Sequence, residues 1–330
     1  MGKIRIEMGE WTKRLHAGLI PAVPVPFDAE GRIHRAAQDA YVRFMAKQPV
    51  QGVAVWAHTG RGLLLTAEQR AEVLRCWRAG LPPDRCVVAG VGANAKEKPE
   101  LEAYSDAALK MAEEALELGA DAFLVHPPTV FRELRDRDER IVRHHKRLAA
   151  LNVPLVLFYL YEAAGGILYS PAVLRELLAL PQVIGIKMAT LDSVMTFQDV
   201  AHLILQEQPH KLLITGEDRF LGYSLMCGAR AALIGMGAAC CKLQAELIRS
   251  IQDQAESARF LELSRKVDRL ACHTFIHPME GYIRRMLWVL VHQEVIPMEA
   301  ANDPWGPDLP ESEFQALGRL LREIGDTNPL

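Results

Sequence analysis

The sequence predicts a (β/α)8 barrel, the TIM-barrel architecture, followed by a C-terminal helical extension. Short apolar runs alternate with longer amphipathic segments, and eight such pairs follow one another along the chain. The turn after the first run reads PAVPVPFD, whereas an open doubly wound sheet would carry a glycine-rich phosphate-binding turn there. The span from Ala17 to Gln254 has the length of one barrel, about 250 residues. The 330-residue chain therefore needs no second independent fold.

Eight apolar runs are expected to form the strands of the barrel. Most are rich in Val, Ile or Leu and too short for helices, as strands buried on both faces should be. The runs are Leu19–Val25, Gly52–Trp56, Cys86–Val91, Ala122–Val125, Pro154–Tyr159, Val183–Lys187, Leu212–Thr215 and Ala232–Met236.

The amphipathic segments between these runs are expected to form the outer helices. The first starts near His34 and ends before Pro49. The next opens at Thr66, a good N-cap residue that is followed by an acidic residue in the first turn. Pro171 follows Ser170 and suits the first position of a helix. The remaining segments are Pro99–Leu118, Arg137–Leu151, Pro171–Leu180, Ser193–Gln208, Arg219–Cys227 and Cys240–Gln254.

After Gln254 the alternation stops. Three helical segments follow with no strand between them: Ala255–Ile276, Pro278–Val295 and Pro310–Ile324. The chain is therefore expected to divide into an N-terminal lead (1–16), the barrel (17–254) and a helical extension (255–330).

Composition and charge exclude several classes of function. The net charge of −3 leaves no basic excess for nucleic acid or an anionic membrane. The longest apolar run, Val153–Tyr161, is far shorter than the roughly 18 residues of a membrane span. The N-terminus has no apolar signal-peptide core, and the six cysteines show no metal-like spacing. We expect a cytoplasmic protein without metal or cofactor, with the pair His144–His145 exposed on an outer helix.

A lysine closes the sixth apolar run. Burying an ammonium group is costly, so Lys187 is unusual at the end of a strand. Strand alternation places Val183, Gly185 and Lys187 on one side, and Gly185 would leave space beneath the amine if that side faces the barrel interior. A desolvated lysine at this position would stay partly neutral and form a Schiff base with a carbonyl. The alternative is a lysine that extends to the barrel mouth or pairs with a carboxylate.

Other site candidates follow neighbouring strands. If Leu155 and Leu157 point inward, Tyr159 does too, and its phenol would move protons for the lysine, although a core tyrosine is the alternative. The loop after the second run reads AHTGRG. There His58 would act as acid or base, and Thr59 with Gly60 would cradle a carboxylate, unless this is only a glycine-rich loop.

The loop after the eighth run adds further small residues to the predicted site. It begins with Gly235 and Met236. Active sites of such barrels lie at the C-terminal ends of the strands, so both residues are candidates for substrate binding.

In this order, the motifs together resemble the dihydrodipicolinate synthase / N-acetylneuraminate lyase family of class I aldolases. PVPFD…GRI is similar to the family's TPF…G.I, AHTGRG stands at its GTTGE, and AGVGAN matches AG.GAN. VIGIKMAT matches IGIKEAT, and GED resembles GDD. Tyr159 precedes Lys187 by the family's usual spacing. The likeness covers roughly Gly18 to Glu323.

The resemblance implies a barrel in which Lys187 condenses with pyruvate or another 2-keto acid and Tyr159 shuttles protons. It also implies that Thr59 and Gly60 hold the keto-acid carboxylate, and that the protein is a homodimer or homotetramer. His58 replaces a threonine of the family's proton relay. Ala164 stands where an arginine binds the second carboxylate of aspartate semialdehyde, so this substrate loses its anchor.

Arg61 replaces the family's usual glutamate. It would meet an anionic group of the substrate, or form a surface pair with a neighbouring acid. The chain is thus expected to be a Schiff-base lyase, aldolase or dehydratase of a 2-keto acid, with a 2-keto-3-deoxy sugar acid as the preferred class. The alternatives are dihydrodipicolinate synthase activity proper and a barrel that binds a keto acid without turning it over.

Overall fold

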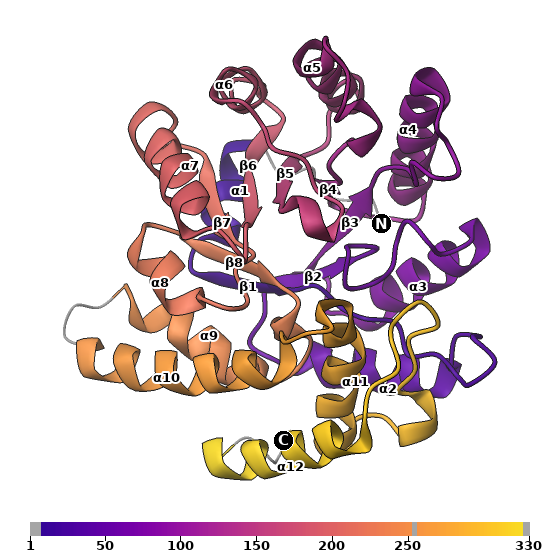
Figure 1. Ribbon diagram of the computed structural model, residues 1–330, viewed down its shortest axis with the longest axis vertical. Helices are drawn as coiled ribbons and strands as arrows, with labels where there is room; N and C mark the ends of the chain where they lie inside the picture. Colours follow the sequence, from indigo (N-terminus) through magenta and orange to yellow (C-terminus); the bar gives the residue numbers. More distant parts are fainter. Residues whose placement is uncertain (1–7, 253–255, 326–330) are drawn as a thin grey trace.

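The computed structural model describes residues 8–252 and 256–325, and within them eight parallel strands form a barrel (Figure 1). Each strand pairs with its sequence neighbours, and a bridge between Ala22 and Ala54 joins the first strand to the second. The expected (β/α)8 fold is confirmed. The strands are β1 Gly18–Pro21, β2 Gly52–Val55, β3 Cys86–Val91, β4 Ala122–Val125, β5 Leu155–Leu160, β6 Val183–Ala189, β7 Leu212–Thr215 and β8 Ala231–Ile234.

Helices surround the barrel, as the amphipathic segments predict (Figure 1). The Thr66 hydroxyl accepts from the Gln69 N–H, and the Gln69 side chain accepts from the Thr66 N–H, which completes a capping box. Ser170 caps its helix, with Pro171 at the first position. The helices are α2 Arg35–Ala46, α3 Ala67–Gly80, α4 Leu101–Glu117, α5 Arg137–Ala149, α6 Pro171–Leu178, α7 Val194–Glu207, α8 Leu221–Met226 and α9 Cys241–Ser250.

A short helix that was not expected precedes the barrel. It is α1, Met8–Leu15, and lies within the predicted N-terminal lead, of which residues 1–7 are outside the described part. Trp11 and Leu15 are buried in the same apolar cluster as side chains of the barrel interior. The helix therefore closes one end of the barrel, and the other end is left for the site.

The C-terminal extension consists of α10 Ser257–Thr274, α11 Tyr282–His292 and α12 Glu311–Ile324. A single 3-10 turn, η5 Met279–Gly281, leads into α11. Figure 1 shows α10 and α12 along one side of the barrel, and α11 contacts both of them. The boundary predicted at residue 254 falls outside the described residues.

The two faces of β5 correct the predicted orientation of its side chains. Phe158 and Leu160 belong to the cluster inside the barrel, whereas Leu157 and Tyr159 belong to the cluster between the strands and the helices. The Tyr159 ring packs edge-on against Tyr169, with ring centroids 5.5 Å apart. The expectation that Tyr159 points inward is therefore wrong, and Phe158 occupies the inner position.

A register shift in the neighbouring strand disturbs the alternation further. Leu155 of β5 pairs with Val183 of β6, the register then slips, and Phe158 pairs with Lys187. Val183 lies in the outer cluster, so it does not share the inward face of Lys187 as expected. An irregularity of this kind adds one residue to a strand, so the side chains that follow it point to the opposite face from the one that simple alternation predicts.

His144 and His145 are buried, which contradicts their expected exposure. Both lie on the inner side of α5, where the His144 ring packs against Tyr104 and Phe131. The His145 Nδ1 lies 2.8 Å from the Ile141 carbonyl oxygen. Burial lowers the pKa of both, that of His145 to about 4, so each imidazole is neutral at pH 7.

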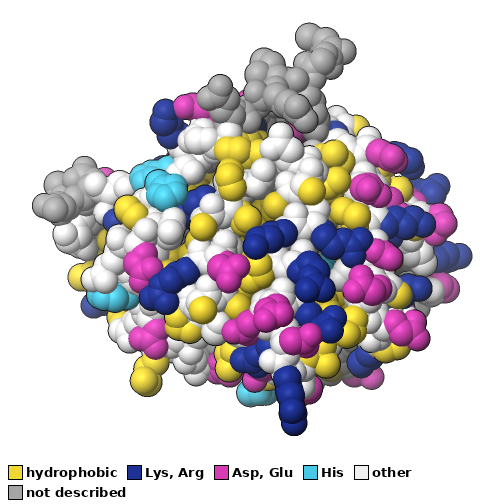
Figure 2. Space-filling view, turned by 90° about the horizontal axis from the view of Figure 1, so that it is seen from above, with side chains coloured by type: hydrophobic (Ala, Val, Ile, Leu, Met, Phe, Trp, Pro, Cys, Tyr) yellow, Lys and Arg dark blue, Asp and Glu magenta, His cyan; other side chains and the backbone are white. Residues whose placement is uncertain are grey.

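The outer face over α4 to α7 carries charges of both signs. Figure 2 views the molecule from this side and shows basic and acidic side chains interspersed with apolar ones. Several basic residues of α5 have acidic neighbours, as in the pairs Arg140–Asp136 and Arg147–Asp106. In residues 8–252 and 256–325, no helix is long and apolar enough to span a bilayer.

Candidate active site

A small cavity lies at the C-terminal end of the barrel, opposite α1. Strands β5 and β6, the loops after β2, β7 and β8, and the segment from η5 to α11 supply its walls. Its lining includes His58, Thr59, Phe158, Leu160, Tyr161, Ala164, Lys187, Ala189, Leu191, Gly216, Asp218, Gly235, Phe275, Met279, Glu280 and Tyr282.

Lys187 lines this cavity from inside the barrel and is 5% exposed. Its Nζ lies 4.1 Å from the centre of the Phe158 ring. Removal from water lowers the pKa of Lys187 to about 8, against the opposing charges of Asp218 and Glu217. A substantial fraction of the amine is therefore neutral near pH 8, the form that attacks a carbonyl.

A glycine of the next loop makes room for the lysine stem. A Cβ placed on Gly216 would lie 2.6 Å from the Lys187 Cε. The sequence assigned this function to Gly185, but a Cβ there would meet the Leu212 carbonyl oxygen at 2.3 Å. Gly185 therefore permits close strand packing, and Gly216 accommodates Lys187.

Two buried carboxyl groups lie beside the lysine, in the GED segment after β7. Asp218 accepts a hydrogen bond from the Met236 N–H at 2.7 Å. Glu217 accepts from the N–H and hydroxyl of Thr190 and from the Leu191 N–H. Burial raises the pKa of each to about 7. Asp218 lines the cavity, so it is a candidate for proton transfer or for binding a substrate hydroxyl.

A tyrosine of the C-terminal extension forms the opposite wall. The Tyr282 hydroxyl lies 3.0 Å from the Thr59 hydroxyl and 3.1 Å from the His58 Nδ1. Its ring stacks on Phe275 with centroids 4.6 Å apart. A Cβ on Gly235 would come within 3.0 Å of the Tyr282 ring, so this glycine leaves the space that the phenol occupies.

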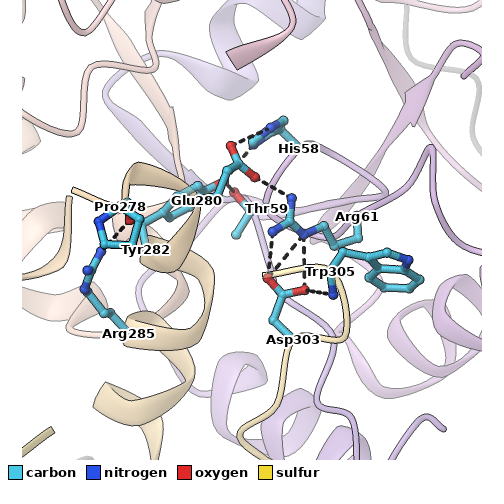
Figure 3. Close-up of polar contacts among 9 residues, drawn as sticks. All are labelled: His58, Thr59, Arg61, Pro278, Glu280, Tyr282, Arg285, Asp303 and Trp305. Carbon is cyan, nitrogen blue, oxygen red and sulfur yellow. Dashed lines mark hydrogen bonds and ion pairs between the residues drawn. The ribbon is translucent and has the colours of Figure 1, made fainter. Parts of the chain in front are cut away.

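Glu280 links His58 to a buried ion pair (Figure 3). One carboxylate oxygen lies 3.4 Å from the His58 Nε2, and the other accepts from Arg61 at 2.5 Å. Arg61 also bonds Asp303, with a shortest distance of 2.7 Å. Arg61 therefore pairs with two acids of the extension, which agrees with the alternative of an acid-paired arginine, except that the pair is buried and not at the surface.

Arg285 fixes the segment that carries Glu280 and Tyr282. It is fully buried on α11, and its Nη1 donates to the carbonyl oxygens of Ile276 and Pro278 at 2.9 and 3.1 Å. Its Nε donates to Glu313 of α12. This charged anchor therefore holds the segment through which the extension places Glu280 and Tyr282 in the cavity wall.

The structure brings together four of the residues that the sequence proposed: Lys187, His58, Thr59 and Gly235 line the cavity. The other four, Tyr159, Gly60, Arg61 and Met236, do not line it. The Gly60 N–H donates to the Ala57 carbonyl oxygen at 3.0 Å, and the Met236 N–H donates to Asp218, so both donors are engaged within the protein.

Phe158, Asp218, Glu280 and Tyr282 also line the cavity and were not among the predicted site residues. Phe158 could have been found by counting alternation from the other face of its run. No local pattern indicated the two extension residues, because they reach the site only through tertiary folding. Among residues 8–252 and 256–325, no group of three or more His, Cys, Asp or Glu side chains is arranged to hold a metal ion.

Comparisons with known proteins agree with the observed fold. A family model described as "Dihydrodipicolinate synthetase family" matches residues 15–321. A 4-hydroxy-tetrahydrodipicolinate synthase from Synechococcus sp. is 28% identical over 64% of this chain, and the match spans 65% of that relative, just under two thirds.

Solved structures match over most of their length. A sialic acid aldolase from Ruminococcus gnavus has a TM-score of 0.78 at 20% identity, covering 94% of this chain and 98% of that one. YagE from Escherichia coli K12, solved in complex with pyruvate, has a TM-score of 0.79 at 20% identity, covering 93% and 98%. At these identities the two structures establish the fold alone.

Proposed function

Because the chain belongs to the dihydrodipicolinate synthetase family, we propose that it is an enzyme of the class I aldolase and lyase type and that it forms a Schiff base between Lys187 and a 2-keto acid such as pyruvate. One observation carries the proposal. Lys187 is a buried amine with a pKa of about 8, placed at the wall of a cavity where strand ends converge. A structural lysine would instead reach solvent or complete an ion pair.

The reaction follows from the chemistry of the imine. The neutral amine attacks the keto carbon, and loss of water leaves a protonated imine that withdraws electrons from the neighbouring carbon. Cleavage or formation of a carbon–carbon bond, or loss of a hydroxyl group, then becomes accessible. The enzyme is an aldolase or dehydratase in this scheme.

The cavity wall favours a substrate that carries no second carboxylate beyond the keto-acid group that condenses with Lys187. Ala164 supplies no cation there, and the ionisable groups near Lys187 include the acids Asp218 and Glu280. Carboxylates repel an anion and accept hydrogen bonds from hydroxyl groups. We therefore propose a 2-keto-3-deoxy sugar acid, or its aldehyde fragment, rather than aspartate semialdehyde.

Borohydride reduction tests the Schiff base. Incubation with pyruvate and borohydride should add the mass of one reduced pyruvate adduct, and peptide mapping should locate it on Lys187. Lys187→Ala should abolish the adduct, while Lys110→Ala, which removes an exposed amine on α4, should retain it. No adduct, or an adduct that survives Lys187→Ala, would refute the proposal.

We also propose a cytoplasmic homodimer or homotetramer, which rests on the family alone. Light scattering with size-exclusion chromatography measures the mass directly. A monomeric mass at working concentration would refute the assembly without affecting the assignment of Lys187.

A further inference from the structure

The strand position opposite Lys187 holds a side chain that cannot move protons. Phe158 pairs with Lys187 across β5 and β6 and places its ring under the amine. Schiff-base chemistry needs proton donors and acceptors at several steps. The tyrosine next in sequence, Tyr159, packs on the far side of the strand against Tyr169. The acid and base must therefore come from elsewhere in the cavity wall.

We propose that Tyr282, His58 and Glu280 form the proton relay of the Lys187 site, with Tyr282 as the group that touches the substrate. This inference rests on the proposed Schiff-base function and deepens it. Tyr282, His58 and Glu280 line the same cavity as Lys187. The phenol oxygen is 3.1 Å from the His58 Nδ1, and the His58 Nε2 is 3.4 Å from Glu280.

The hydrogen-bond directions in the array follow from its members. The Glu280 carboxylate oxygen lies 3.4 Å from the His58 Nε2, a charge contact rather than a hydrogen bond, and we assign the imidazole proton to this Nε2 because a carboxylate only accepts. The Nδ1 is then unprotonated and accepts from the Tyr282 hydroxyl, while the Thr59 hydroxyl donates to the same phenol oxygen. This arrangement prepares the phenol to lose its proton to the imidazole as it gains one from a substrate.

Two balanced steps use the array. In imine formation, the ammonium of Lys187 and the ketone together give a protonated imine and water, so Nζ loses two of its three protons and both end on the departing oxygen. Tyr282 passes the first proton, whose loss leaves the neutral amine that attacks, to the carbonyl oxygen, and it passes the second, from the carbinolamine nitrogen, to the leaving hydroxyl group. In enamine formation, the C3–H bond of the imine breaks and its proton joins the Tyr282 oxygen. The phenol proton moves to the His58 Nδ1, and the C–H electron pair becomes the C=C bond.

Buried charges hold Glu280 in its position. Arg61 binds one oxygen of Glu280 at 2.5 Å and pairs with Asp303, whose side chain is 2% exposed. These residues act through Glu280 and do not line the cavity, so they are positioning residues. The relay is therefore assembled from the loop after β2 and from the C-terminal extension, which contributes Tyr282 and Glu280.

Exchange of the methyl protons of pyruvate in D₂O tests the relay with pyruvate as the only substrate. Proton NMR follows the exchange, and borohydride trapping on the same sample measures imine formation. Tyr282→Phe should still give the trapped adduct at saturating pyruvate, which also reports an intact site. Its exchange rate should fall about 10²–10⁴-fold. Glu280→Gln keeps the side-chain shape, and should retain the adduct while exchange slows about tenfold.

Two tyrosine variants complete the test. Tyr159→Phe changes a tyrosine of the outer layer and should leave exchange unchanged. Tyr161→Phe removes the other phenol of the cavity. The relay would be overturned if Tyr282→Phe exchanged the methyl protons of pyruvate at the wild-type rate. It would also be overturned if Tyr161→Phe, and not Tyr282→Phe, lost the exchange. A wild-type protein that traps pyruvate without exchanging its protons would overturn it too. Absence of the wild-type adduct would instead refute the Schiff-base function, so the two failures are distinguishable.

Discussion

Replacing Lys187 with methionine should stabilise the protein while removing its imine. Burial lowers the pKa of this amine from 10.5 to about 8. Each pKa unit corresponds to about 1.36 kcal/mol, so holding the charged amine in the cavity costs about 3 kcal/mol below pH 8. Methionine has a similar length and no charge. At pH 7 we therefore expect Lys187→Met to raise the free energy of unfolding by up to about 3 kcal/mol. The gain is reduced by the favourable charge interaction that Asp218 loses when Lys187 is removed.

The sign of the pH dependence gives a sharper test than the difference at one pH. Between pH 8 and 10.5 the unfolded chain retains a proton that the native amine has released, so wild-type stability rises with pH. The advantage of Lys187→Met should accordingly shrink above pH 8 and vanish above 10.5. Urea unfolding of both proteins at several pH values measures this, with Lys110→Met as the exposed control. An advantage that is constant from pH 7 to 11, or no advantage, would refute the reasoning.

The surroundings of Lys187 and the buried charges of the fold can be tested in four further ways. The rate of borohydride-trapped adduct formation at low pyruvate should rise with pH and level off above about 8, as Lys187 loses its proton; a flat profile would contradict this. Gly216→Ala should abolish trapping, because its Cβ would lie 2.6 Å from the Lys187 Cε; an unchanged yield would count against the geometry. Arg61→Met should lower the free energy of unfolding by about 3–5 kcal/mol by leaving Asp303 buried and unpaired; urea titration should show a smaller loss when Asp303→Leu is added. Burial lowers the pKa of His145 from 6.5 to about 4, so the free energy of unfolding should fall by about 3 kcal/mol as pH drops from 6.5 to 4. In an acid titration, His145→Leu should reduce that fall.

The fold was largely predictable because buried parallel strands and amphipathic helices leave different periodicities in the sequence. All eight expected strands are present, and the caps at Thr66 and Ser170 are confirmed. Helix α1 was missed because its eight residues, rich in charge, are too short for a clear period. His144 and His145 were misplaced because residue type alone does not show which face of α5 its neighbours cover.

The site was only half predictable. Lys187 could be predicted because it is a charged residue at the end of an apolar strand, where burial of the charge is unfavourable. The choice between Phe158 and Tyr159 failed because a shift of one residue exchanges the two faces of a strand, and the register slips at the start of β5 and β6. Tyr282 and Glu280 contact His58 although more than half of the sequence separates them, and no local pattern indicates such a contact.

A crystal structure of the protein with bound pyruvate is the most direct test of the imine at Lys187. We expect continuous electron density from the Lys187 Nζ to the second carbon of pyruvate, with the Tyr282 hydroxyl facing the adduct. Pyruvate bound without a covalent link to Lys187, or attached to another residue, would contradict it.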